Sequence, residues 1–184
     1  MLTHKGTKEL HTDRLILRRF YENDAEAMYR NWASDSEVTK YLIWPTHESV
    51  DTTRAIIASW IKEYENDNCY QWAIVYEGEP IGSISVVSQH ERIEKAEIGY
   101  CMGKNWWHKG IMSESLGAVI AFLFDEVGFQ RIESRHDPNN PHSGGVMRKC
   151  GMTYEGTHRR ADRNNQGICD TSYYGILKEE YRKE

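Results

Sequence analysis

Hydrophobic and polar positions alternate in the stretch RLILRRF, Arg14 to Phe20, which predicts a β-strand. The segment AEAMYRNW, residues 25–32, then has helical spacing, and Asp24 stands before it as a candidate N-cap. After the break WPTHES, a second helix is predicted from about Val50 to Glu65. Its apolar face consists of Ile56, Ile57, Trp60, Ile61 and Tyr64. The pattern therefore begins with one strand and two helices.

The middle of the chain is rich in residues that favour strands. The segment YQWAIVYEGEPIGSISVVS, residues 70–88, contains two such runs, and the tripeptide Glu77-Gly78-Glu79 joins them as a hairpin turn. A third strand is predicted near Ala96 to Met102. These three strands are expected to form an antiparallel meander.

Helices and strands alternate in the second half. A helix is predicted to end at Gly128. Its apolar positions are Leu116, Val119, Ile120, Leu123, Phe124 and Val127. RIESRHD, residues 131–137, is the next strand, and NNPHSGGVMRKCG is a helix with Asn140 as N-cap, Pro141 at its first position and Gly151 past its end. A last strand lies in TSYYGILKEEY, reached after the segment TYEGTHRRADRNNQG. The order β-α-α-β-β-β-α-β-α-β-β predicts an α/β (α+β) fold, a mixed sheet with helices on both faces.

Composition and charge narrow the class of protein. The 184 residues are 39% hydrophobic and 28% charged, which is typical of a soluble globular domain and excludes a disordered chain. The net charge of −5 argues against a general nucleic-acid binder. The basic run HRRADR, His158 to Arg163, is interpreted as a solvated loop, with contact to an acidic partner as the alternative.

The four cysteines are far apart and form no C-x-x-C pair, so reduced thiols are expected and no metal site is predicted. The chain has no run of about 18 apolar residues, and its start, MLTHKGTKEL, lacks the apolar core of a signal peptide. A cytoplasmic protein without a membrane segment is expected.

The stretch KNWWHKGIMSES, residues 104–115, places a basic residue and a glycine directly before a helix. A helix N-terminus has about four unpaired N–H groups and a partial positive charge, which suit a phosphate or pyrophosphate. Gly110 would let the backbone approach such a ligand, and Lys109 stands beside it. An ordinary basic turn is the alternative. The sequence contains neither a G-x-x-x-x-G-K-[ST] loop nor a G-x-G-x-x-G motif after a strand.

Three segments together resemble the GNAT acetyltransferase superfamily, specifically the RimJ/RimL group of ribosomal-protein N-acetyltransferases. They are AEIGYCMGKNWWHKGIMSESL, DPNNPHSGGVMRKCGMTYEG and DTSYYGILKEEY. The resemblance covers most of the chain, in the right order. It implies a single domain over residues 1–184 and a mostly antiparallel sheet. It also implies a splay between the fourth and fifth predicted strands, residues 96–102 and 131–137, where the pantetheine arm of coenzyme A would lie against an open strand edge.

The resemblance also implies which residues bind the cofactor, acetyl-CoA. The family segment W-G-K-G-[YI]-[AM]-[TS]-E, whose main-chain N–H groups hold the pyrophosphate, reads here from Trp107 to Glu114, with His108 where glycine is usual. The motif N-x-x-S places Asn140 against the pantetheine and Ser143 near the sulfur. The implied cofactor contacts are Ile98, Tyr100, Trp107, His108, Lys109, Gly110, Ile111, Met112, Ser113, Asn140 and Ser143. Alternatives stay open: at least one of Trp106 and Trp107 is expected to anchor the core, and Asn140 to act as a helix cap.

The implied reaction is direct transfer of an acetyl group to a primary amine. Glu97 and Asp162 are the candidate bases, the alternatives being an ion pair of Glu97 with Lys95 or an arginine, and a solvated loop position for Asp162. Ser143 or Tyr174 is the candidate proton donor to the thiolate, and N–H groups of the splayed strand are expected to face the oxyanion. A covalent acyl-cysteine at Cys101 is disfavoured, since no histidine is obviously paired with it.

Two functions remain open from the sequence. One is an acetyl-CoA-dependent N-acetyltransferase that acts on a protein N-terminal α-amine, ribosomal or other, or on a small-molecule amine. The other is a catalytically idle module that binds acyl-CoA. A monomer or homodimer without direct nucleic-acid or membrane binding is expected. The acceptor is expected to be chosen by residues 31–49 and 158–167, which carry no readable motif.

Overall fold

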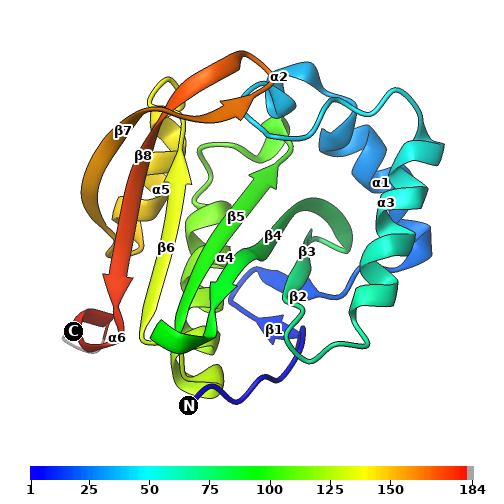
Figure 1. Ribbon diagram of the computed structural model, residues 1–184. Coiled ribbons are helices and arrows are strands. Elements are labelled where there is room, and N and C mark those ends of the chain that lie inside the picture. Colours follow the sequence, from blue (N-terminus) through cyan, green and yellow to red (C-terminus); the bar gives the residue numbers. More distant parts are fainter. Residues whose placement is uncertain (182–184) are drawn as a thin grey trace.

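The computed structural model describes residues 1–181, and within them eight strands form one sheet in the order β1-β2-β3-β4-β5-β6-β8-β7 (Figure 1). The strands are β1 (Leu10–His11), β2 (Leu15–Arg18), β3 (Gln71–Tyr76), β4 (Glu79–His90), β5 (Lys95–Met102), β6 (Arg131–His136), β7 (Thr153–Asn164) and β8 (Gly167–Leu177). Among the neighbours in this sheet, β5 and β6 are parallel and the others antiparallel. The predicted mixed, mostly antiparallel sheet is confirmed.

Helices cover both faces of the sheet. They are α1 (Ala25–Met28), α2 (Ser36–Thr39), α3 (Val50–Glu63), α4 (Ile111–Phe122), α5 (Pro141–Lys149) and α6 (Lys178–Tyr181). The helices α1 and α3 lie on one face beside β2–β4, and α4 and α5 lie behind the sheet in Figure 1. Each side has its own apolar cluster: Trp32 and Ile57 belong to the first, and Leu116, Val119 and Ile120 to the second. Burial of these faces is the main stabilising term of the fold.

Two predicted helices continue as a wider, π-helical turn. Helix α1 passes into Tyr29–Ala33, and α4 passes into Leu123–Val127, so both span the predicted ranges. Gly128 ends the second at φ +97°, a left-handed conformation that favours glycine. The hairpin turn between β3 and β4 also holds as predicted, with Glu77 at φ +51° and Gly78 at φ +83°.

The splay predicted between residues 96–102 and 131–137 is present between β5 and β6. The two strands pair only from Lys95–Arg131 to Glu97–Glu133, and from Ile98 onward β5 is paired on its β4 side alone. A bulge in β4 puts Val87 above Gly99, where a Cβ would lie 2.8 Å from a Val87 methyl carbon. The sheet thus opens in the middle, between α4 and α5 on its rear face.

Strand β1 was not predicted, because two residues carry no periodicity. The last strand lies in the predicted tail and ends at Leu177, and residues 178–181 are the helix α6. Two local predictions are wrong. Residues 158–163 are not a solvated loop but part of β7, an edge strand whose side chains are mostly exposed, so hydrophobic alternation is absent. Asp24 does not cap α1; its carboxylate accepts the Tyr21 N–H at 2.8 Å and pairs with Arg18 at 2.7 Å.

Within the described residues the four cysteines are free, in line with the expected reduced thiols. No helix in the same range is both long and apolar enough to span a membrane.

Candidate functional site

The turn before α4 is held by its two tryptophans in different ways. Trp106 packs against the core, and a Cβ on Gly103 would lie 2.9 Å from its ring, so only glycine fits beneath it. Trp107 stays 39% exposed and donates its indole N–H to the Met102 carbonyl at 2.8 Å. Trp106 is therefore the predicted core anchor, and Trp107 closes the turn.

Two left-handed residues then direct the chain into the helix. His108 has φ +60° and Gly110, the N-cap of α4, has φ +76°. Histidine tolerates this region better than most side chains, which explains how it occupies a position where glycine is expected. The Gly110 carbonyl accepts the Glu114 N–H at 3.0 Å and so closes the first helical turn. The N–H groups of residues 111–113 precede that bond, and helix geometry leaves them without partners in α4.

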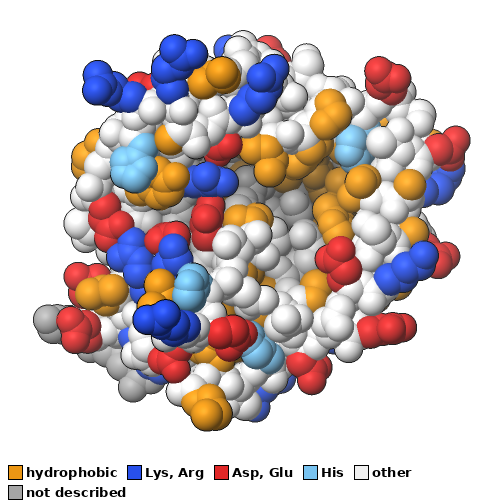
Figure 2. All heavy atoms as spheres, in the orientation of Figure 1, with side chains coloured by type: hydrophobic (Ala, Val, Ile, Leu, Met, Phe, Trp, Pro, Cys, Tyr) orange, Lys and Arg blue, Asp and Glu red, His pale blue; other side chains and the backbone are white. Residues whose placement is uncertain are grey.

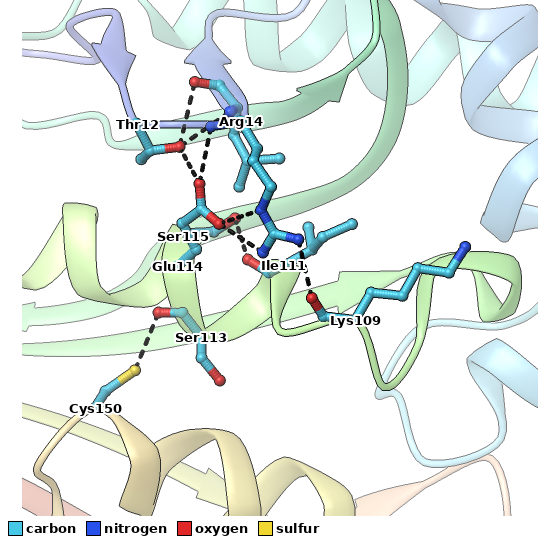
Figure 3. A network of polar contacts seen from close by, with 9 residues as sticks. Thr12, Arg14, Lys109, Ile111, Ser113, Glu114, Ser115 and Cys150 are labelled. Carbon is cyan, nitrogen blue, oxygen red and sulfur yellow. Dashed lines mark hydrogen bonds and ion pairs between the residues drawn. The ribbon is translucent and has the colours of Figure 1, made fainter.

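A polar clamp fixes the start of α4 to β2 (Figure 3). The Glu114 carboxylate accepts the Thr12 hydroxyl at 2.5 Å and the Arg14 Nε–H at 2.8 Å. Arg14 also donates to the Lys109 carbonyl at 3.1 Å, which ties the loop to the helix. Burial opposes ionisation of Glu114, but the hydrogen bonds from Thr12 and Arg14 hold its pKa below the ordinary value. The anion lies in the first turn, where the helix dipole favours it.

Two cations from elements distant in the sequence lie close to Gly110. A Cβ built on Gly110 would lie 3.6 Å from the Lys149 ammonium and 3.7 Å from the Arg14 guanidinium. The Lys109 side chain, which the sequence placed beside the helix start, extends away from the clamp in Figure 3. Lys149, in the last turn of α5, was missed because the sequence gives no signal that α5 and α4 face each other.

A cavity of about 380 Å³ lies between the start of α4, the open part of β5 and α5. It is lined by most of the predicted cofactor residues: Tyr100, Trp107, His108, Gly110, Ile111, Met112, Ser113, Asn140 and Ser143. It is also lined by Val38, Leu42, Cys101, Met102, His142, Gly145, Val146 and Lys149. Neither Lys109 nor Ile98 lines it. Ile98 is buried in the core, and its carbonyl accepts the Ser134 hydroxyl at 2.7 Å.

The residues at the start of α5 lie on the far wall of this cavity. Asn140 occupies the predicted N-cap position, with Pro141 after it, but its side chain makes no capping bond, and the residue lines the cavity. The imidazoles of His142 and His108 meet edge to face, with ring centroids 4.8 Å apart. Their contact joins the two walls.

Ser143 and Tyr100 form a hydroxyl pair inside the cavity. The Ser143 hydroxyl donates to the Tyr100 oxygen at 3.1 Å, and the Tyr100 hydroxyl donates to the Ser143 carbonyl at 3.0 Å. Burial raises the pKa of Tyr100 well above its ordinary value, so the phenol keeps its proton. Tyr174, the other candidate acid, does not line the cavity, and its oxygen accepts a hydrogen bond from Arg148 at 2.7 Å.

The two candidate bases lie together on the front face of the sheet. Arg135 of β6 contacts the Glu97 carboxylate at 2.7 Å and the Asp162 carboxylate at 3.2 Å. Lys95 instead pairs with Glu133 at 2.6 Å. Burial raises the pKa of Glu97 although Arg135 opposes the shift. Neither carboxylate lines the cavity, but Glu97 shares β5 with Cys101, which does.

Cys101 is poorly suited to be a nucleophile. Burial raises the pKa of its thiol to about 11, so the reactive thiolate is scarce at neutral pH. Its sulfur lies 3.3 Å from the Ser83 hydroxyl oxygen. This agrees with direct transfer.

Comparison with known proteins decides the family. The Acetyltransferase (GNAT) domain model matches residues 14–153. The uncharacterized N-acetyltransferase YoaA of Bacillus subtilis (strain 168) is 32% identical over 171 residues, which span 92% of this chain and 96% of YoaA. The ribosomal-protein-serine acetyltransferase of Escherichia coli (strain K12) is 25% identical over 173 residues, 90% of this chain and 94% of that protein. The chain belongs to the GNAT acetyltransferase family. The fold of RimL, solved in complex with coenzyme A, agrees with a TM-score of 0.83 at 22% identity, over 92% of this chain and 98% of RimL.

This GNAT protein is an N-acetyltransferase, and GNAT enzymes use acetyl-CoA. Its residues fit that cofactor. The start of α4 offers unpaired N–H groups of residues 111–113 and a glycine without a Cβ, with Lys149 and Arg14 nearby for negative charge. From Ile98 to Met102, β5 has an open edge that can hydrogen-bond to an amide-bearing arm. No metal-binding cluster was found among residues 1–181.

Proposed function

We propose that this enzyme transfers the acetyl group of acetyl-CoA directly to a primary amine, either the α-amine of a protein N-terminus or an amine of a small molecule. The observation that supports the proposal best is the position of the cavity. It runs along the start of α4 and α5 and reaches Cys101 on β5, the strand whose front face carries Glu97. A thioester held along the cavity would therefore reach the side of the sheet on which two carboxylates lie.

Bound acetyl-CoA supplies the activated acetyl thioester. The N–H groups of residues 111–113 hold the pyrophosphate, and Lys149 and Arg14 balance its charge. N–H groups on the open edge of β5 are expected to stabilise the negative charge that develops on the acetyl oxygen. The protein thus orients the acetyl carbon and keeps it at the opening of the sheet.

Protons move on either side of that opening. Glu97 or Asp162, directly or through a water, accepts the proton that the amine nitrogen loses as the new N–C bond forms. The Ser143 hydroxyl, whose single proton is donated to Tyr100 in this structure, turns to donate a hydrogen bond to the departing sulfur. At pH 7, deprotonation costs about 1 kcal/mol for an α-amine and nearly 5 kcal/mol for a lysine side chain, from their reference pKa values. An α-amine therefore needs only a modest base, which suits carboxylates tied to an arginine.

Thiol release from acetyl-CoA, followed over a panel of amino-terminal peptides, polyamines and aminoglycosides, tests the proposal. We expect thiol release that depends on the amine, with an acetyl group found on the amine nitrogen by mass spectrometry. Tight acetyl-CoA binding without release for every amine class would contradict it. An acetyl group found on the Cys101 sulfur would contradict direct transfer.

A further inference from the structure

Strand β7 contains a pronounced bulge between His158 and Asp162. His158 pairs with Thr171 and Asp162 with Cys169, so three residues, 159–161, lie opposite the single residue Asp170. Arg160 in the middle has φ +52°, a left-handed conformation that is unfavourable for a residue with a side chain. Its N–H donates to the Asp170 carboxylate at 2.8 Å, which holds the bulge in shape. Bulges of this kind re-aim side chains, often beside active sites.

The side chains that the bulge re-aims are basic. Arg159, Arg160 and Arg163 are exposed, and within residues 1–181 no carboxylate forms an ion pair with any of them. Six other arginines contact a carboxylate: Arg14, Arg18, Arg30, Arg54, Arg131 and Arg135. Arg19, Arg92 and Arg148 form no ion pair within the described residues, but they lie far apart in the chain. Three unpaired arginines within five residues at and beside the bulge stand out in a chain of net charge −5.

This basic bulge, residues 159–163, adjoins the acceptor side of the site. Asp162, between the arginines, contacts Arg135, which contacts Glu97. At the tip of the same hairpin, the Asn165 amide donates to the Thr39 and Trp44 carbonyls, both at 2.8 Å, and so joins β7 to the α2 region. In Figure 2, Lys and Arg side chains gather along the upper edge, where Figure 1 shows the β7–β8 hairpin, above a hollow with hydrophobic walls. The unpaired charges therefore border the route by which an amine reaches Glu97.

We infer that the basic bulge is a docking surface for a polypeptide acceptor that carries carboxylates in the residues following its reactive amine. The inference rests on the proposed function and narrows its acceptor to an acidic peptide or protein terminus. Charge complementarity carries it: exposed guanidinium groups pair well with carboxylates, and Arg presents a planar fork to them. Exposed pairs are individually weak, so three arginines together should change acceptor affinity by about tenfold.

The test compares two peptides and three proteins. Both peptides have a free α-amine; one continues with alternating Glu and Ala, and the other has Gln in place of each Glu. The bulge variant combines Arg159→Gln, Arg160→Asn and Arg163→Gln, because Asn tolerates the left-handed backbone at 160 and keeps the N–H bond to Asp170. The matched control is Arg92→Gln, an exposed arginine on the turn before β5. Peptide binding is measured by fluorescence anisotropy and acetylation by thiol release.

We expect the wild type to bind the acidic peptide about tenfold more tightly than the Gln peptide, and the bulge variant to lose this preference through KM while kcat stays within about twofold. The preference should weaken with added salt. The bulge variant should keep the wild-type affinity for acetyl-CoA, and Arg92→Gln should keep the wild-type preference for the acidic peptide. Equal affinity for both peptides, or an equal loss for both in the bulge variant, overturns the inference. Stronger competition from a short RNA than from the acidic peptide would assign the surface to nucleic acid instead. Because anisotropy measures peptide binding without turnover, it tests docking even if no amine is acetylated. A lack of acetylation would contradict only the proposed function.

Discussion

The two sides of the β5–β6 opening use different kinds of groups. On the α4–α5 side the ligand would meet main-chain N–H groups of residues 111–113, placed by the left-handed Gly110 and the Arg14–Glu114 clamp. On the acceptor side the proposed reactive groups are side chains, Glu97 and Asp162, joined by Arg135. The first side should tolerate changes of side chain but not of backbone conformation. The second should depend on single functional groups and keep its fold when they change.

The largest effect is expected on the acceptor side. Glu97→Gln or Asp162→Asn, whichever removes the base, should lower kcat by about 10²- to 10⁴-fold and leave the acetyl-CoA Kd within a few fold, because a general base acts on the reaction and not on cofactor binding. Burial raises the pKa of Glu97, and only its deprotonated form accepts a proton. If Glu97 is the base, wild-type kcat should therefore fall as pH drops through that raised pKa.

Glu155→Gln is the matched control, since Glu155 pairs with Arg131 at 2.5 Å on the same part of the sheet. Its kcat should be close to wild type. Wild-type kcat in both single variants, from about pH 6 to about pH 9, would exclude a carboxylate base and leave a water relay or self-deprotonation of the substrate.

On the cofactor side, Gly110→Val should weaken acetyl-CoA binding by about tenfold or more. A β-branched residue at φ +76° is strained by about 1–2 kcal/mol and adds bulk where the backbone must approach phosphate. The companion change His108→Gly should keep the Kd within a few fold, because main-chain groups hold the ligand. Calorimetry on folded protein measures both. If His108→Gly weakened acetyl-CoA binding more than Gly110→Val, the imidazole and not the backbone would hold the cofactor.

The clamp behind that loop gives a smaller effect, on stability. Glu114→Gln should lower the free energy of unfolding at neutral pH by about 1–2 kcal/mol, since hydrogen bonds to a charged carboxylate are lost. The pKa of Glu114 is lowered in the folded state, so its contribution is present above the ordinary glutamate pKa and is lost as pH falls through the folded value. The difference between wild type and variant should therefore shrink toward acid pH. Urea titrations with Glu126→Gln, an exposed partner of Lys8, as control would show whether any glutamate gives the same loss.

Much of the fold could be predicted because its signals are local. Alternation in 14–20 and helical spacing in 116–127 each decide an element within a few residues, and Gly128 ends its helix by backbone conformation alone. The loop predicted at residues 158–163 was wrong because an exposed edge strand buries neither face and so leaves no apolar period. The bulge at residues 159–161 interrupts whatever alternation remains.

The site divides in the same way. The loop before α4 could be proposed as the cofactor site because a turn before a helix is contiguous in sequence, and Trp107, Gly110 and residues 111–113 line the cavity. Lys149, Arg14 and Arg135 were missed as partners because each acts across a tertiary contact between elements far apart in the chain. Nothing local to Arg135 indicates that β7 and β5 would both present carboxylates to it.

The smallest effect is expected at Ser143, whose side chain is proposed to meet the cofactor sulfur. Ser143→Ala should slow acetyl transfer by about fivefold, the value of a single neutral hydrogen bond, and leave acetyl-CoA binding within a few fold. A serine hydroxyl is too weak an acid to act alone, so its role depends on position and on its bond with Tyr100. An acetyl thioester with a more acidic thiol needs less help to leave, and it should recover part of the lost rate. The same deficit with both leaving groups would mean that Ser143 only shapes the pocket. Tyr100→Phe, which removes the other hydroxyl of the pair, should then be compared with Tyr174→Phe. Tyr100 lines the cavity and Tyr174 does not, so the larger effect is expected at Tyr100.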